Sequence, residues 1–461
     1  MGSNRLKMME EGNVVRAILR LAVPTMLGMV VQMVYNMTDT YFIGQTGDPY
    51  LVAGISLVMP LFYVIQGIGN IFAVGSASLI SRQLGAKQPE KANRTCAVAV
   101  WSTVLLGAFL TVALLLLQGP ILSLTGMSEA TAKPANDYFH IIAMFAMPMI
   151  LNVTLGGQLR SEGATHHATI GTAIGLGVNI LLDPLLILRM GLNAAGAAWA
   201  TVAGACCSIT YFLTVYGRRK TVLRPVPRNF KPQREIYAET LKIGGPAALS
   251  QIVMSFTSIL SNNVAASFGD VTVAGAGVYM RVGTLCLMLL MGLTTGYQPF
   301  AGYSYGAGNF ARLRQGFRAT VLIATGVACA FDILFLTQGE NMIRFFIDDP
   351  GTVEVGAMML RALCLAMPFV GLQLTLTVTF QALGKALQAM IITVGRQLAL
   401  YVPLLMLLPK WFGLPGFAFA QPVADVLTTV IAAALFVSLF RHLREEEALA
   451  AKDPKKGESA T

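Results

Sequence analysis

Long apolar runs alternate with short polar breaks along nearly the whole chain. The runs Ala97 to Leu117 and Ala168 to Leu188, for example, are almost free of charge. Each has about 20 residues, the length that a helix needs to cross about 30 Å of hydrocarbon. Because a chain in lipid must satisfy its own backbone groups, such runs are expected to be helices. Twelve spans are predicted, near residues 14–44, 51–81, 94–118, 135–157, 166–189, 195–217, 238–267, 272–302, 314–337, 355–380, 387–409 and 415–440.

The two halves of the chain repeat one another at a nearly constant offset. Pro24 recurs as Pro246, and Gly75 recurs as Gly296. Since six spans return the chain to its starting side, the copies are parallel and related by an axis along the membrane normal. We therefore predict an all-α membrane protein of two six-helix lobes, with a substrate cavity between them and access that alternates as the lobes rock. The expected parts are an N-terminal lobe (1–217), a basic linker (218–237), a C-terminal lobe (238–440) and a tail (441–461).

Composition and charge predict an orientation in the membrane. Charged residues make up only 12% of the chain, against about 25% in soluble domains. The net charge of +10 comes from clusters at the start, after the second and eighth spans, in the linker and in the tail. Loops rich in Lys and Arg face the cytoplasm. We therefore expect the inner (plasma) membrane with both termini cytoplasmic, and the lipid bilayer rather than nucleic acid as the partner. The densest basic cluster is Arg218, Arg219, Lys220, Arg224, Arg228, Lys231 and Arg234, and the opposite loops hold Asp48, Asp270, Glu340, Asp348, Asp349 and Glu354.

Several kinds of chemistry find no support in the sequence. The start, Met1 to Gly12, lacks the apolar core of a signal peptide. The six cysteines fall in apolar runs without a CxxC pair or a histidine at ligand spacing, so we interpret them as packing residues. There is no GxxxxGK[ST] loop for ATP, and no motif for an enzyme. We expect no enzymatic activity and no cofactor. ATP-driven pumping would need a separate subunit, and the energy for transport must otherwise come from an ion gradient.

Asp39 is the first candidate for ion coupling. It lies five residues before Gly44, at the outer end of the first span. Gln32, Asn36 and Asp39 are spaced by four and three residues, which places them on one helix face. An acid at hydrocarbon depth is a functional candidate by default. The alternative is a carboxylic acid held by neighbouring donors for packing specificity.

Asp183 is the second candidate, near the outer end of the fifth span. Asn179 lies four residues earlier on the same face, and Pro184 follows directly. Proline disturbs the carbonyl of the residue four positions back, so carboxylate, amide and carbonyl oxygens together offer a site for a proton or a hard cation such as Na⁺. Thr201 and both acids are predicted roughly 8 to 9 Å below the outer surface. The alternative is a proline kink with a locally satisfied Asp.

The second half of the chain lacks these acids. The repeat places Ser261 where the first half has Asp39 and Val402 where it has Asp183. Because residues that serve only folding should recur in both lobes, this asymmetry favours a site in the first lobe. The second half instead has its own charges within spans, which we expect to be buried and which are Arg281, Asp332, Arg361, Arg396 and Asp425. Asp425 with Arg396 or Arg281 is either a neutral structural pair or part of a second ion site.

The chain contains 23 methionines, and several lie on the first, seventh and eighth spans. Flexible, polarizable side chains suit varied apolar ligands, although methionine is also common as lipid-facing filler. The residues expected to line the substrate cavity are Gln32, Met33, Met254 and Met288.

These features resemble the multidrug and toxic compound extrusion (MATE) family of the MOP superfamily, from about residue 14 to 440. The resemblance rests on Pro24 to Asp39 followed by Gly44, and on the segments 82–86, 157–163, 179–184 and 196–201 (RQLGA, GQLRSEG, NILLDP and GAAWAT). It is closest to the prokaryotic DinF-like branch, which implies that Asp39, Asn179, Asp183 and Thr201 form a cation site. It also implies export of cationic, amphipathic drugs in exchange for H⁺ or Na⁺.

A lipid-linked oligosaccharide flippase of the same superfamily usually needs a strongly cationic cavity, whereas most Lys and Arg here lie outside the predicted spans. A receptor or enzyme finds no supporting motif. We expect the protein to act as a monomer.

Overall fold

The computed structural model describes residues 2–123, 125–218 and 220–452, and every regular element in this part of the chain is a helix. The N-terminal half contains α1 (Gly2–Glu10), α2 (Val14–Gly44), α3 (Pro49–Gly85), α4 (Pro89–Leu116), α5 (Gln118–Ser123), α6 (Glu129–Met144), α7 (Ala146–Ser161), α8 (Thr165–Asp183), η1 (Pro184–Arg189) and α9 (Asn193–Gly217). The linker contains η2 (Pro227–Asn229). The C-terminal half contains α10 (Arg234–Ala266), α11 (Asp270–Gly306), α12 (Phe310–Arg344), α13 (Pro350–Ala382), α14 (Ala386–Met390), η3 (Ile391–Tyr401) and α15 (Val402–Lys452). Arg219, Lys455 and Lys456 of the predicted basic clusters lie outside the described residues.

The described helices account for the twelve predicted spans. Ten are long and apolar enough to cross a membrane, and α6 with α7, bent by 57°, makes an eleventh. One of the ten, Ala386–Leu439, has 54 residues, which is far longer than one crossing requires. Its backbone leaves the helical conformation at Gly413, so it serves as two spans. The expected all-helical, multi-pass membrane fold is confirmed, whereas the exact lobe limits stay a prediction.

The repeat is visible in the backbone as well as in the sequence. Gly163 and Gly384, which are repeat partners, both have positive φ, at 77° and 78°. Each follows the long span that ends with α7 in one half and with α13 in the other. A residue with a Cβ rarely adopts this conformation, which explains why both turns use glycine.

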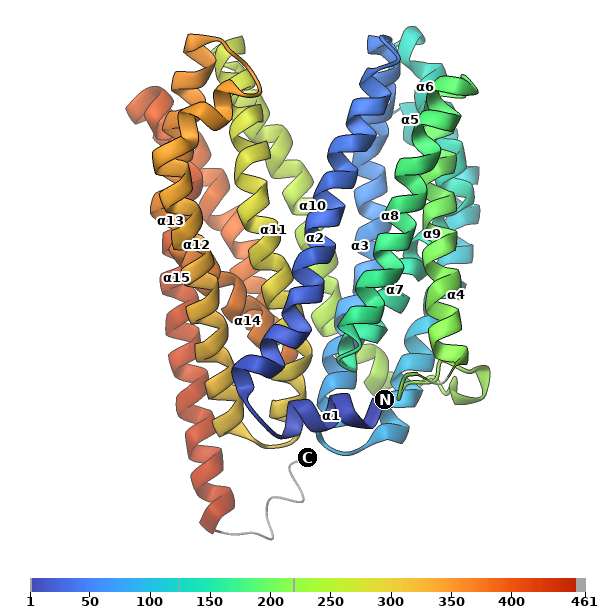
Figure 1. Cartoon of the computed structure of the whole chain (residues 1–461), viewed down its shortest axis with the longest axis vertical. Coiled ribbons are helices and arrows are strands. Elements are labelled where there is room, and N and C mark those ends of the chain that lie inside the picture. The colour runs from blue at the N-terminus through green and yellow to red at the C-terminus, as the bar shows by residue number, and fades with distance from the viewer. Residues whose placement is uncertain (1, 124, 219, 453–461) are drawn as a thin grey trace.

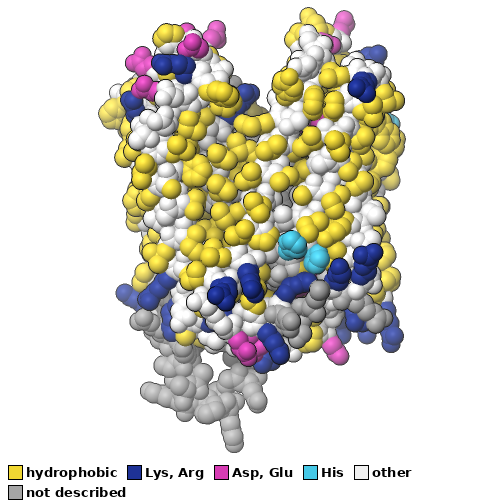
Figure 2. Space-filling view, viewed as in Figure 1, with side chains coloured by type: hydrophobic (Ala, Val, Ile, Leu, Met, Phe, Trp, Pro, Cys, Tyr) yellow, Lys and Arg dark blue, Asp and Glu magenta, His cyan; other side chains and the backbone are white. Residues whose placement is uncertain are grey.

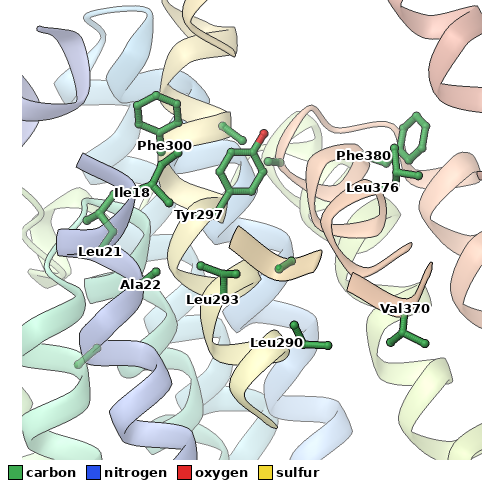
Figure 3. Packing of buried hydrophobic residues seen from close by; sticks show 14 of the residues in the cluster. Ile18, Leu21, Ala22, Leu290, Leu293, Tyr297, Phe300, Val370, Leu376 and Phe380 are labelled. Atoms are coloured by element: carbon green, nitrogen blue, oxygen red, sulfur yellow. The ribbon is translucent and has the colours of Figure 1, made fainter. Parts of the chain in front are cut away.

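Glycines bring the two halves together at one end of the molecule. α3 packs on α10, and α2 packs on α11. A Cβ on Gly75 would lie 2.1 Å from the Thr240 carbonyl oxygen, and one on Gly296 would lie 2.4 Å from the Ala22 Cα. Gly75 and Gly296 are repeat partners, so the two contacts are related by the internal symmetry. Figure 3 shows Ala22 of α2 close to Leu293 of α11 within this shared core.

The other end of the molecule is open. In Figure 1 the helices of the two halves meet at the lower end and diverge toward the top, with α2, α10 and α11 between them. Figure 2 shows a notch between the halves at the upper end, walled largely by hydrophobic side chains. Lys and Arg gather along the lower end, and most Asp and Glu lie at the upper end. The cleft therefore opens on the acidic face and is closed on the basic face.

Two of the charges expected to be buried in the second half are exposed. The side chain of Arg361 is 59% exposed and pairs with Glu340 at 2.5 Å. Arg281 is also exposed, and no carboxylate lies within ion-pairing distance of it in the described part of the chain. The expectation of burial was wrong because Arg361 pairs with an acid near the end of α12, and Arg281 lies on an open face of α11.

Candidate functional site

The two acids predicted for the first lobe lie next to each other. Asp39 on α2 and Asp183 at the end of α8 lie close enough for their carboxyl groups to interact directly. α2 and α8 are brought together lower down, where the Thr169 hydroxyl donates to the Pro24 carbonyl oxygen at 2.9 Å. A Cβ on Gly28 would lie 3.3 Å from the Thr169 methyl group, so glycine permits this close packing. Asp183 is completely buried, whereas Asp39 is half-buried.

Asn179 joins Asp183 to Thr201 on α9. With its amide oriented so that both atoms are satisfied, the nitrogen donates to Asp183 Oδ2 at 2.9 Å. The amide oxygen then accepts from the Thr201 backbone N–H at 2.9 Å. In the reverse orientation the nitrogen lies 3.2 Å from Thr201 Oγ1 and the oxygen faces Asp183. The first orientation supports a carboxylate, and the second would present an extra oxygen to a cation.

One oxygen of Asp183 has no protein partner. Asp183 Oδ1 is buried and accepts no hydrogen bond from any described residue. Buried polar atoms are nearly always satisfied, so an orphaned carboxylate oxygen beside a second carboxyl group needs a proton or a cation. This is the feature of the site that most directly indicates ion binding.

Two tyrosines complete the site and were not predicted from the sequence. The Tyr35 phenol lies close to Thr201 and to both acids. Tyr138 on α6 lies close to Tyr35 and both acids, and it is only 4% exposed. Tyr35 stands four residues before Asp39, a spacing that could have revealed it. Nothing in the sequence around Tyr138 points to the acids, since α6 reaches them only through the fold.

Asn36 does not join this cluster. Its side chain is exposed, and its Oδ1 accepts a hydrogen bond from Gln32 Nε2 at 3.3 Å. Asn36 and Asp39 share a broad face of α2, but the contacts of the acid are with α8, and the contact of Asn36 is within α2. Its role in ion coupling stays a prediction.

The residues expected to line the cavity lie on α2, α10 and α11. α2 and α11 touch at Met26 and Gly292. Met33 is two turns above Met26 on α2, and Met288 is one turn above Gly292 on α11. Both methionines therefore rise from that contact on the facing sides of the two helices. Gln32 is half-buried, and Met254 is exposed on α10. Their binding of substrate stays a prediction.

The second half holds a neutral ion pair rather than a mirrored acid pair. Arg396 Nη1 lies 2.5 Å from Asp425 Oδ1, and Gln421 Nε2 donates to the same carboxylate. Asp332 is buried, and its Oδ1 has no partner among the described residues. In the same part of the chain, no cluster of three or more His, Cys, Asp or Glu side chains is arranged to hold a metal ion. The first lobe therefore has the more complete arrangement of oxygen atoms.

Comparison with known proteins agrees with the two-lobe organisation. A family model described as MatE matches residues 24–185 and 246–407, two segments of equal length with one in each half. The multidrug export protein MepA of Staphylococcus aureus (strain MSSA476) is 29% identical over 441 residues, which cover 96% of this chain and 97% of that protein. The MepA protein of Staphylococcus haemolyticus (strain JCSC1435) is 27% identical over 448 residues, covering 97% and 99%.

Solved structures share the fold along nearly the whole chain. A crystal structure of MATE in complex with MaL6 has a TM-score of 0.91 at 24% identity, covering 95% of this chain and 99% of that one. An outward-facing conformation of a multidrug resistance MATE family transporter of the MOP superfamily has a TM-score of 0.90 at 25% identity, covering 96% and 99%. The two lobes and the open cleft thus belong to a known transporter architecture.

Proposed function

Since this chain belongs to the MatE family, we propose that it is a multidrug efflux antiporter of the inner (plasma) membrane. It exports cationic or amphipathic organic compounds in exchange for H⁺ or Na⁺. The observation that carries the proposal is the adjacency of Asp39 and Asp183, with one buried oxygen of Asp183 left without a protein partner. The names of the MepA relatives support the drug-export part.

Asp39, Asn179, Asp183 and Thr201 act together as the ion site. Two carboxylates side by side in an apolar lobe repel one another and lack solvation, so the pair is stabilised by taking up one proton or one sodium ion. Tyr35, which lies close to Thr201 and to both acids, helps to hold Thr201 in place. For H⁺, the Asn179 amide donates to Asp183, as in the satisfied orientation. For Na⁺, the amide turns so that its oxygen becomes a ligand.

Ion binding is coupled to the shape of α2. Asp39, on the upper part of α2, faces Asp183 of α8, whereas Met26 and Thr25 on the lower part of α2 contact α11. Pro24 lies within the lower part of α2, where its carbonyl oxygen accepts from Thr169, and its missing N–H weakens the helix there. Neutralising the acid pair changes how α2 packs on α8, and this change is passed to the contact with α11. That contact closes the cleft toward the basic face, which we assign to the cytoplasm.

Substrates occupy the cleft above the contact between Met26 and Gly292. Met33 and Met288 offer polarizable surfaces to the substrate, and Gln32 offers a hydrogen-bonding group. Met254 adds an exposed side chain from α10. Exchange of one monovalent cation for one proton moves no net charge, so the membrane potential does not oppose export. The protein works as a monomer, because each chain has both lobes and the cleft between them.

The runner-up is a flippase for lipid-linked oligosaccharides, and Arg281 is the observation that favours it. Arg281 lies eleven residues before Gly292, which is three helical turns, and so on the side of α11 that faces α2. An exposed guanidinium on that side would attract a phosphate. One arginine is less than the cationic cavity that such a carrier needs, so drug export remains the preferred function.

Transport in inverted membrane vesicles tests the proposal. A pH gradient and a sodium gradient are imposed separately, and ethidium uptake is followed by fluorescence. We expect one of the two gradients to drive uptake in the wild type and in Asp270→Asn, an exposed acid outside the site. Asp39→Asn should abolish it. Uptake of no cationic dye under either gradient, with movement of a polyprenyl-linked sugar instead, would support the flippase.

A further inference from the structure

A groove runs along the first three turns of α2, on the outside of the molecule near its basic end. It has a volume of about 610 Å³ and is lined by Asn13, Val15, Arg16, Leu19, Arg20, Val23 and Pro24. Arg16 and Arg20, one turn apart, form one side, and Val15, Leu19 and Val23 form a row beside them. All five of these side chains are exposed. The groove thus joins a doubly basic site to an apolar strip.

Neither arginine has an acidic partner. No carboxylate among the described residues lies within ion-pairing distance of Arg16 or Arg20. Glu10, the acid closest in sequence apart from Glu11, pairs with Lys87 at 3.0 Å. Arg20 lies seven residues beyond Asn13, about 10 Å along the helix, where an unpaired charge at the lipid boundary is costly. Its side chain needs an anion that lipid itself can supply.

The internal repeat shows that this feature belongs to α2 alone. At the offset that relates Pro24 to Pro246, Arg20 corresponds to Lys242 and Arg16 to Ala238 on α10. Lys242 is paired with Glu239 at 3.1 Å, so the second copy is neutralised within the protein. The fold therefore does not require two free cations at this position.

We propose that the groove binds one anionic phospholipid. The phosphate lies between Arg16 and Arg20, and an acyl chain follows Leu19 and Val23 toward the membrane centre. Basic pockets at the cytoplasmic ends of membrane helices recognise anionic head groups in this way. Two arginines without an acid favour phosphatidylglycerol over phosphatidylcholine, whose choline nitrogen they repel.

Lipid retention by the purified full-length protein tests the site. Native mass spectrometry would follow protein titrated with phosphatidylglycerol, with phosphatidylcholine and with inorganic phosphate. We expect the protein to retain one phosphatidylglycerol, and R16Q/R20Q to bind it about tenfold more weakly, since each basic residue near the surface strengthens binding of anionic lipid severalfold. R228Q/R234Q, which removes two exposed charges from the linker, should bind as the wild type does.

Two results would overturn the proposal. The first is equal retention by R16Q/R20Q and R228Q/R234Q, which would show that only the net charge matters. The second is binding of inorganic phosphate as strong as the binding of phosphatidylglycerol, which would make the ligand a free anion. If the double variant is produced in poor yield, a photoreactive residue in place of Leu19 tests the site with both arginines present. This residue should crosslink phosphatidylglycerol in preference to phosphatidylcholine.

A second, independent inference concerns α1, which crosses the basic end from one lobe to the other. On the second lobe, Arg312 of α12 donates from Nε to the Met9 carbonyl oxygen at 2.7 Å and from Nη1 to that of Gly12 at 3.0 Å. Its Nη2 donates to the carbonyls of Met8 and Glu11 at 3.2 and 3.1 Å. The last carbonyls of a helix lack partners within it, so Arg312 caps α1.

The first lobe also binds α1, through Arg5. Arg5 Nη1 lies 3.4 Å from Glu162 Oε1, and Arg5 Nη2 donates to the Lys220 carbonyl oxygen at 3.0 Å. Glu162 Oε2 in turn accepts from the backbone N–H groups of Val222 and Leu223 at 2.8 and 3.0 Å. The end of α7, the linker and α1 are thus one hydrogen-bonded unit.

We infer that α1 is a strap that holds the basic end closed and must release Arg312 before the cleft can open to that side. Spin labels on Lys91 of α4 and Gln315 of α12, both exposed, report the separation of the lobes there. R312Q and a chain lacking residues 2–9 should both add a longer-distance population. R318Q, an exposed arginine on the same helix, should match the wild type. Distance distributions unchanged in both strap variants would contradict the inference.

Discussion

The hydroxyl group of Thr25 in α2 donates to the backbone oxygen of Gly292 in α11 at 2.6 Å. This hydrogen bond joins the two lobes one residue beyond Pro24, beside the Gly296 contact with Ala22. Small residues allow helices to approach closely in membranes, where packing and hydrogen bonds replace the hydrophobic effect. The closure of the basic end therefore depends on glycine at specific positions of α11.

A methyl group at Gly296 should open this closure. The added Cβ would lie 2.4 Å from the Ala22 Cα, and backbone cannot move aside as a flexible side chain can. We expect Gly296→Ala to destabilise the protein by about 1–3 kcal/mol, seen as a lower melting temperature in detergent. Gly277→Ala on the same helix, where nothing lies within 4 Å of the new Cβ, is the control and should melt like the wild type. Equal melting of the two variants would contradict the closure described here.

Loss of the Tyr35 hydroxyl should weaken the ion site without disturbing the fold. Tyr35→Phe keeps the ring and removes the hydroxyl group beside Thr201 and the acids, so Thr201 and Asn179 lose part of their positioning. We expect about a tenfold higher concentration of the coupling ion for half-maximal transport, since the loss of one polar contact in a site costs about 1–1.5 kcal/mol. Tyr41→Phe, which alters an exposed tyrosine six residues further on, should leave this concentration unchanged.

Arg396 and Asp425 should behave as a structural pair. Asp425→Asn leaves the partly buried Arg396 unpaired, so it is expected to destabilise the protein by about 3 kcal/mol. The double variant R396Q/D425N leaves no charge unpaired and should recover most of this loss while transporting normally. Melting temperatures and dye transport of the three variants provide the test. Normal stability but no transport in Asp425→Asn would instead assign this pair to an ion pathway.

Glu162 should make stability depend on pH. Burial raises the pKa of this carboxyl group, which lies in the turn after α7, to about 7, while the backbone N–H groups and Arg5 oppose the shift. Between about pH 4.5 and 7 the folded protein keeps a proton that the unfolded chain releases, so stability falls as pH rises through this range. Glu162→Gln mimics the protonated form, and its stability does not fall in this way. The free energy of unfolding of the variant, relative to that of the wild type, should therefore rise by up to about 3 kcal/mol from pH 5 to pH 8. A constant difference in melting temperature across this range would contradict the assignment.

Much of the fold follows from patterns that the sequence displays directly. Apolar runs predict the spans, and the constant offset between repeat partners predicts the two lobes, because both are local or pairwise properties of the chain. The break between α6 and α7 is different. Met147-Pro148 lies just beyond a 57° bend, whereas its repeat partner Met367-Pro368 lies within the continuous helix α13. The same dipeptide gives two outcomes, so packing against neighbouring helices decides between them.

The candidate site shows the same division. Asp39, Asn179, Asp183 and Thr201 could be proposed from helical spacing and depth, and the structure brings all four together. Tyr138 could not, because α6 contributes it through tertiary packing alone. Helical spacing also grouped Asn36 with Asp39, but residues three apart on one face still differ in direction by about 60°. Asn36 therefore contacts Gln32 instead of the acids. Spacing identifies a face of a helix, and only packing identifies what that face meets.

Ion release on drug binding tests the central claim most directly. Purified protein in weak buffer is titrated with ethidium, and released protons or sodium ions are counted against drug bound. We predict about one ion released per drug in the wild type and in Asp270→Asn. Release should be absent in Asp39→Asn, in Asp183→Asn and equally in the double variant, because the two acids act as one unit. Full release by Asp39→Asn and Asp183→Asn, with loss in Asp332→Asn, would show that the coupling site lies in the other lobe.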